Sequence, residues 1–151
     1  MENYIVNSTF VAYLADIYEN SLFPYVQTIK EVKEELGHLR GIFDIRIEEI
    51  ASKDQTLQKG DWEKYLSEVD LSLLRTAKAS KKILITDDKK LAKAAQVNGV
   101  SVLNTPRFIA TLAFNGILKY DVAVSILEKL LPLYNRKNVL KKVLKDLNNW
   151  R

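Results

Sequence analysis

Short apolar segments alternate with amphipathic segments along most of the chain, and this alternation is the strongest constraint on its fold. Residues 4–6, 83–85 and 100–103 have the composition of buried strands. Each is followed by a polar cluster that can cap a helix, and then by apolar residues at helical spacing. Strands that alternate with helices predict an α/β fold, in which helices cover both faces of a mostly parallel sheet.

The segments between these units are less regular. Residues 25–27 predict a second strand, and Thr28 with Glu31 fits the capping box of a helix that follows it. Apolar and polar residues alternate over 43–48, which predicts a half-buried strand. Residues 51–66 mix Lys, Asp and Gln with scattered apolar anchors, and they predict the loosest connection of the chain.

Two amphipathic helices are expected at the end of the chain. We treat residues 1–151 as a single domain, with the helices at about 120–150 as a C-terminal extension. Their apolar stripes fit simple core packing, and they also fit a surface for a homodimer or another protein partner.

The composition excludes several kinds of site. The 151 residues include no cysteine and one histidine, so a disulfide scaffold, a zinc ribbon or a histidine-based triad is not expected. Catalysis would depend on carboxylates, lysines, hydroxyls and metal ions bound by oxygen. No segment has the length of apolar sequence that a membrane span needs, and the start lacks a signal-peptide pattern, so we expect a cytoplasmic protein without a membrane partner.

Charge is distributed unevenly along the chain. Residues 1–80 carry 9 Lys and Arg against 14 Asp and Glu, whereas residues 81–151 carry 14 against 5. This pattern fits an acidic metal site beside a surface that binds nucleic acid. It also fits two solvated faces that neutralise each other.

Four polar positions or clusters are the candidates for chemistry, because ligands collect at the carboxyl ends of parallel strands. They are residues 7–9 after the first strand, Glu35, Asp70, and residues 86–88 after the strand at 83–85. Each also has a purely structural explanation as a helix cap, a capping-box acid or a solvated partner of a lysine. Their order along the chain is more informative than any one of them.

In this order the chain resembles a PIN-domain ribonuclease over roughly residues 3–115. Residues 4–14 (YIVNSTFVAYL) look like the family's opening strand, acid and hydroxyl residues. Residues 28–36 (TIKEVKEEL) look like its second motif and place the acid at Glu35. Residues 66–74 (LSEVDLSLL) look like the third, with Asp70, and residues 83–92 (ILITDDKKLA) look like the fourth. The resemblance implies a PIN-like three-layer fold.

The same resemblance implies an activity and a site. The activity is metal-dependent hydrolysis of RNA phosphodiester bonds, with carboxylates that hold Mg²⁺ or Mn²⁺ and activate a water. The implied catalytic residues are Asn7, Glu35, Asp70 and Asp88, and the implied metal ligands are these four with Asp87. The resemblance leaves open whether Asp87 or Asp88 faces the metal. Ser8, Thr9 and Thr86 would orient waters or phosphate oxygens. Lys89, Lys90, Lys93 and Arg107 would contact RNA phosphates, although a solvated helix face explains these lysines equally well.

One position departs from the family pattern. Asn7 stands where the family has its first aspartate, and a neutral amide binds a hard cation more weakly and cannot act as a base. The chain is therefore expected to be a ribonuclease, an inactive or weakened relative, or a PIN scaffold that binds RNA or protein without cutting. Without a zinc ribbon, it looks more like the stand-alone group that includes VapC-like toxins than the ribosomal RNA maturation endonucleases. That group implies an antitoxin as a possible partner.

Overall fold

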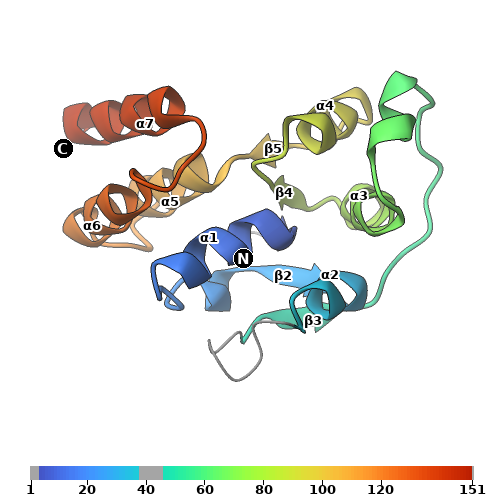
Figure 1. The fold of residues 1–151 in the computed structure, drawn as a ribbon, viewed down its shortest axis with the longest axis horizontal. Coiled ribbons are helices and arrows are strands. Elements are labelled where there is room, and N and C mark those ends of the chain that lie inside the picture. The colour runs from blue at the N-terminus through green and yellow to red at the C-terminus, as the bar shows by residue number, and fades with distance from the viewer. Residues whose placement is uncertain (1–3, 38–45, 151) are drawn as a thin grey trace. The chain divides into compact units, whose positions relative to one another are not determined.

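The computed structural model describes residues 4–37 and 46–150 of the chain, which is divided into two compact units (Figure 1). The first unit is Met1–Leu103 and the second is Asn104–Arg151. The prediction that both form one domain stays a prediction, and each unit is described separately below.

The first unit contains a sheet of five parallel strands. Its order is β3-β2-β1-β4-β5, with β1 in the centre. The strands are β1 (Tyr4–Val6), β2 (Gln27–Ile29), β3 (Glu48–Ile50), β4 (Ile83–Ile85) and β5 (Val102–Leu103). The side chains of β1 and of its neighbour β4 are buried, except for the half-buried Ile83, as expected for a parallel sheet that is covered on both faces.

Four α-helices connect these strands and give the three-layer α/β fold that the sequence predicts. They are α1 (Ser8–Asp16), α2 (Lys30–Glu35), α3 (Glu68–Ser80) and α4 (Lys89–Val97). Apolar residues at helical spacing, such as Phe10 and Leu14 of α1 or Leu73 and Leu74 of α3, are fully buried.

The segment around β2 differs from the sequence prediction. The strand begins at Gln27, since Tyr25 ends the short 3₁₀ helix η1 (Phe23–Tyr25). Thr28 does not cap α2: it is a buried strand residue whose hydroxyl donates to the carbonyl of Val6 over 2.7 Å. The N-cap of α2 is Ile29, without a side-chain hydrogen bond. The capping-box interpretation is therefore wrong.

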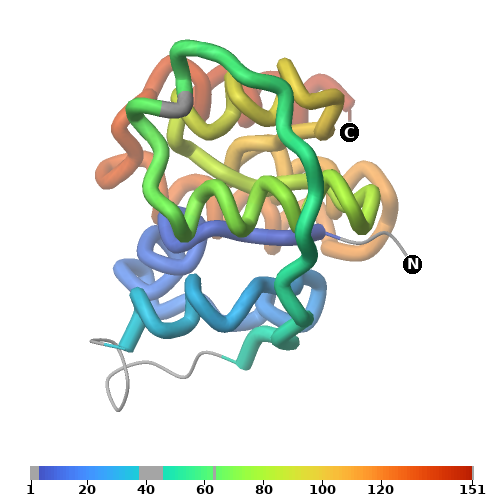
Figure 2. Tube along the Cα trace, turned by 90° about the vertical axis from the view of Figure 1, so that its right-hand side faces the viewer, coloured from blue at the N-terminus to red at the C-terminus, as the bar shows by residue number. Residues whose placement is uncertain are grey.

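The structure also changes the predictions for residues 43–48 and 51–66 of the first unit. Within the predicted strand at 43–48, residues 43–45 lie outside the described residues, and β3 begins only at Glu48. Residues 51–60 have no regular structure and cross α3 as an extended strap (Figure 2). The strap is held by specific hydrogen bonds, so the segment is more ordered than the sequence predicted. A 3₁₀ helix, η3 (Asp61–Tyr65), then leads to α3.

The second unit consists of three helices that pack on one another. They are α5 (Thr105–Phe114), α6 (Tyr120–Leu130) and α7 (Lys137–Trp150). Their buried residues include Phe108, Leu127, Leu140 and Leu147, so the apolar stripes form the core of this unit. A further partner surface on these helices stays a prediction. In the part of the chain that is described, every helix is too short or too polar to span a bilayer.

Candidate functional site

The site starts from the register of the two central strands. Val6 pairs with Ile85, so the first residues after these strands, Asn7 and Thr86, lie side by side at the carboxyl edge of the sheet. The Asn7 backbone N–H donates to the carbonyl of Ile85 over 3.3 Å, and its side-chain Nδ2 donates to Thr86 Oγ1 over 2.7 Å. Only 4% of Asn7 and 1% of Thr86 is exposed, so this contact belongs to the interior.

The other end of the Asn7 amide caps α1. Its Oδ1 accepts from the Thr9 backbone N–H over 3.2 Å and from the Thr9 hydroxyl over 2.6 Å. Because a backbone N–H can only donate, the contact with Thr9 fixes the orientation of the amide and places Nδ2 against Thr86. Both acceptor positions of Oδ1 are therefore used within the protein.

The Thr86 and Thr9 hydroxyls extend this network to the loop after β4. Thr86 Oγ1 also accepts from the Asp88 backbone N–H over 3.1 Å, and Thr9 Oγ1 accepts from the Asp87 backbone N–H over 3.3 Å. The two hydroxyls thus fix the backbone that carries both acids. Asp88, and not Asp87, is the N-cap of α4: its Oδ1 accepts from the Lys90 backbone N–H over 2.9 Å.

Three carboxyl groups from separate helix ends interact beside this network. Partial burial, then the neighbouring Asp70 carboxylate, raises the pKa of Glu35. Burial likewise raises the pKa of Asp70, and the charge of Asp88 raises it further. Hydrogen bonds from the Ser67 side chain and backbone to the Asp70 carboxylate lower its pKa. Ser67 also caps α3, where its hydroxyl oxygen accepts from the Asp70 backbone N–H over 3.1 Å. Glu35, Asp70 and Asp88 therefore form a line of like charges that repel one another.

Glu31 positions the first member of this line, and the sequence analysis missed this role. Its Oε2 accepts from Ser52 Oγ over 2.6 Å, just after β3, and from Ser72 Oγ on α3 over 3.1 Å. Glu35 follows Glu31 by four residues, and Asp70 precedes Ser72 by two. Because residues four apart share one side of a helix, fixing Glu31 to Ser72 holds the side of α2 that carries Glu35 against α3. No sequence signal indicates this contact, because the serines come from distant segments.

The donor set suits Mg²⁺ or Mn²⁺ in its chemistry but is not arranged as a metal centre. Carboxylate oxygens are the ligands that these hard cations take. Within residues 4–37 and 46–150, however, no three His, Cys, Asp or Glu side chains are grouped closely enough to hold one ion. Asp88 uses one oxygen for its cap, and the Asn7 oxygen is occupied by Thr9. Binding would draw Glu35, Asp70 and Asp88 closer together.

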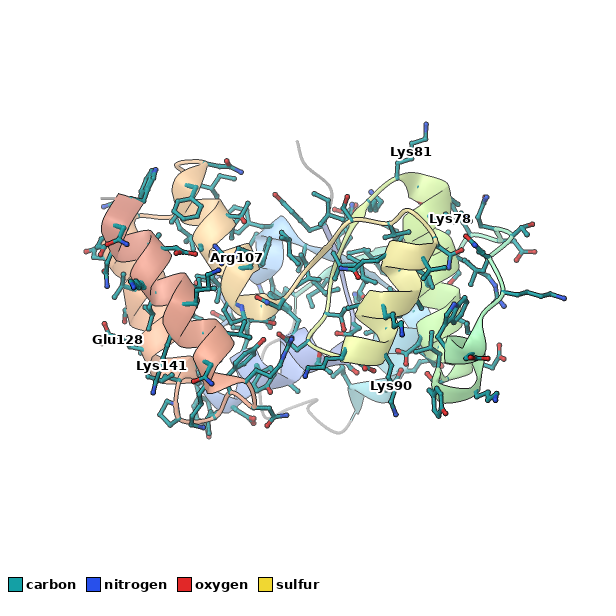
Figure 3. All side chains as sticks on the ribbon, turned by 90° about the horizontal axis from the view of Figure 1, so that it is seen from above. Lys78, Lys81, Lys90, Arg107, Glu128 and Lys141 are labelled. Carbon is teal, nitrogen blue, oxygen red and sulfur yellow. The ribbon has the colours of Figure 1, made fainter. Side chains whose placement is uncertain are left out.

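The remaining predicted residues are Ser8 and three lysines in the first unit, and Arg107 in the second unit. Ser8 begins α1 beside Asn7 and is partly exposed. Lys89, Lys90 and Lys93 are exposed on α4, where the Lys90 ammonium lies 4.8 Å from the centre of the Tyr65 ring. Arg107 belongs to the second unit, where its guanidinium donates to Asp146 Oδ2 over 3.1 Å (Figure 3). Contacts of these residues with RNA phosphates stay predictions.

Comparison with solved structures identifies a protein of the same fold. A PilT N-terminus domain protein, SSO1118 from the hyperthermophilic archaeon Sulfolobus solfataricus P2, superposes with a TM-score of 0.51. The match covers 72% of this chain and 92% of that protein at 14% sequence identity. No protein-family model and no curated protein matches the chain. The likeness establishes the fold, which is the α/β fold of a PilT N-terminus (PIN) domain.

Proposed function

We propose that this chain is a metal-dependent endoribonuclease that hydrolyses RNA phosphodiester bonds. The observation that carries the proposal is the line of carboxylates from Glu35, Asp70 and Asp88 beside the ends of β1 and β4. Repulsion among these carboxylates adds to burial in raising the pKa of Glu35 and of Asp70, and a cation bound among them would offset it. In a fold shared with a PilT N-terminus domain, a divalent cation is the partner that we favour.

The chemistry assigned to this site is hydrolysis at phosphorus. A bound Mg²⁺ or Mn²⁺ ion would lower the pKa of a water and offset charge on the phosphate. Glu35, Asp70 and Asp88 would hold it, with Asp87 beside them. The water oxygen would form a bond to phosphorus while the bond from phosphorus to one ribose oxygen breaks. A carboxylate would accept the water's proton, and the leaving ribose oxygen would take a proton from solvent. Ser8 would orient a phosphate oxygen, and Lys89 and Lys93 would attract the RNA backbone.

Asn7 favours a second candidate, a PIN scaffold that binds RNA or protein without cutting it. Its amide oxygen is saturated by Thr9, so Asn7 acts as a positioning residue rather than as a strong ligand. An aspartate at this position would keep the size of the side chain and add a charge beside the start of α1. The Thr86 hydroxyl would then turn and donate to it.

Manganese-dependent cleavage of a panel of labelled single-stranded RNAs tests both candidates. The chain is assayed beside Asn7→Asp, with Asp70→Asn as the control for a contaminating nuclease. The first candidate predicts cleavage by the chain or by Asn7→Asp, and none by Asp70→Asn. If only Asn7→Asp cuts, the site assignment stands and Asn7 is what silences it.

The scaffold candidate predicts a different result. Neither the chain nor Asn7→Asp would cut any RNA, although both would stay folded by circular dichroism. Equal cleavage by all three proteins would identify a contaminant and remove the support for a nuclease.

A further inference from the structure

The side of α7 opposite its buried residues carries lysines and asparagines only. Lys141, Lys142 and Lys145 are all exposed there, as are Asn138 about one turn before them and Asn149 about one turn after them (Figure 3 labels Lys141). At about 100° per residue, these five positions fall on the side of the helix that is opposite Leu140, Val143 and Leu147, which are buried. We call the three lysines the lysine face.

No carboxylate neutralises this face. The acid of α7, Asp146, is engaged by Arg107 of α5. Among the residues that the structure describes, no ion pair involves Lys141, Lys142 or Lys145. Lys137, one turn before, differs: its ammonium donates to the carbonyls of Pro132 and Tyr134, which ties it to the end of α6. The lysine face therefore has no structural task within its own unit.

The whole second unit reinforces the positive potential of this face. Residues 104–151 contain nine Lys and Arg against three Asp and Glu, a net charge of +6. The first unit, residues 1–103, contains fourteen against sixteen. A positive field on a small helical unit raises the local concentration of polyanions and speeds their association.

The other side of α7 excludes one kind of anionic partner. A helix that lies on an anionic membrane inserts its apolar side into the headgroup boundary. In α7 that side is used for packing in the second unit, where Leu140, Val143 and Leu147 are at most 1% exposed. Trp150, at the end of α7, is 53% exposed but packs edge-on against Phe114. The side of α7 opposite its buried residues presents only cations and amides, which fits a partner recognised by backbone charge.

We infer that the lysine face of α7 binds the phosphate backbone of a nucleic acid, as an electrostatic surface separate from the carboxylate site. Lysines 141 and 145 are one turn apart, about 6 Å along the axis, so they meet successive phosphates rather than one. Neighbouring asparagines can donate to phosphate or sugar oxygens. The inference rests on the proposed function only for the choice of RNA as the first ligand to test.

The test measures RNA binding by the full chain without any cleavage. Fluorescence anisotropy of labelled single-stranded RNA is followed in EDTA at several salt concentrations, with DNA of the same sequence as a second arm. The variant combines Lys141→Gln, Lys142→Gln and Lys145→Gln. The matched control removes the same charge from exposed lysines of the first unit, through Lys59→Gln, Lys64→Gln and Lys81→Gln.

The lysine-face variant is expected to lower the salt slope of binding by about 0.7 per lost phosphate contact, or about two units in total. Affinity should fall on the order of tenfold or more at low salt, whereas the control should change little. DNA bound equally well would identify the backbone alone as the ligand, and tighter RNA binding would add a contribution from the 2′-hydroxyl.

Several outcomes would overturn the inference. They are an unchanged salt slope of RNA binding in the lysine-face variant, an equal loss of RNA affinity in the lysine-face variant and the control, or binding to anionic vesicles but not to nucleic acid. The proposed function is judged separately, by cleavage with Mn²⁺ at saturating RNA. Asp70→Asn should abolish that cleavage and leave the anisotropy unchanged, so either idea can fail while the other stands.

Discussion

The amide nitrogen of Asn7 donates to the hydroxyl of Thr86 over 2.7 Å, and this contact joins residues 79 positions apart in the sequence. Thr86 Oγ1 accepts a second hydrogen bond from the Asp88 backbone. Water cannot replace the hydroxyl at the Asn7 amide, because Asn7 and Thr86 are both buried, whereas the Asp88 backbone N–H is partly buried. This hydroxyl therefore connects the cap of α1 to the loop that carries the acids.

Replacing this hydroxyl should be costly. Thr86→Val keeps the shape of the side chain and leaves the buried Asn7 Nδ2 and the partly buried Asp88 N–H without an acceptor, so we expect the free energy of unfolding to fall by about 2–4 kcal/mol. Urea denaturation measures the loss. Thr111→Val is the matched control, since the Thr111 hydroxyl only donates to Arg107 within its own helix. Similar losses in the two variants would contradict the role assigned to Thr86.

The line of carboxylates makes the stability of the chain depend on pH. The pKa values of Glu35 and Asp70 are raised in the folded state, mainly by burial. The folded state therefore binds more protons than the unfolded state between the ordinary and the raised pKa values. The free energy of unfolding should thus decrease as pH rises through this range.

Substitution of Asp70 tests this sign directly. In Asp70→Asn the free energy of unfolding should decrease less steeply as pH rises. The melting temperature at neutral pH should increase, because a neutral amide is not repelled by the charges of Glu35 and Asp88. Thermal melts between about pH 4 and 8 measure it. Asp54→Asn changes an exposed acid of the same unit and should leave the slope unchanged. If the melting temperature of Asp70→Asn fell more steeply with pH than that of the unmodified chain, the carboxylates would not repel one another.

The sequence predicted the parts of the fold that depend on local patterns. The strands at 83–85 and 4–6 are continuous apolar runs, and both occur as expected. The structural explanation of Asp70 as an acid in the first turn of a capped helix also holds, since its backbone N–H donates to Ser67, the N-cap of α3. Thr28 was misread, because a threonine before a charged helix resembles a cap, whereas its hydroxyl is satisfied by Val6 of the neighbouring strand. Only the sheet register decides between the two interpretations.

The candidate site could be predicted in residue type but not in geometry. Proximity of Asp70 and Asp88 follows from the parallel sheet, since both begin helices at its carboxyl edge. The contact of Glu31 with Ser52 and Ser72 does not follow, because it joins segments 21 and 41 residues apart through single hydroxyls. Sequence periodicity carries no information on such pairs.

Glu31 should control the affinity for a divalent cation without being its ligand. In Glu31→Ala both serines lose their acceptor, α2 is released from α3, and the increase in melting temperature caused by Mn²⁺ should shrink severalfold. Glu31→Gln should restore it, since an amide oxygen still accepts from both serines. Glu34→Ala, which removes only an exposed ion pair with Lys30, is the control. If Glu31→Gln fails to restore the increase, Glu31 acts through its charge.

The strap over α3 depends on the buried side chain of Asn98. Its Oδ1 accepts from the Gln58 backbone N–H over 2.6 Å and from the Lys78 ammonium over 3.2 Å, while its Nδ2 donates to the carbonyl of Ala94. Asn98→Ala should lower the free energy of unfolding by about 2–3 kcal/mol and expose residues 51–60 to limited proteolysis. Gln96→Ala changes an exposed residue of the same helix and should leave the digestion pattern intact. Unchanged cleavage in Asn98→Ala would mean that the bonds of Lys53 and Lys78 hold the strap without Asn98.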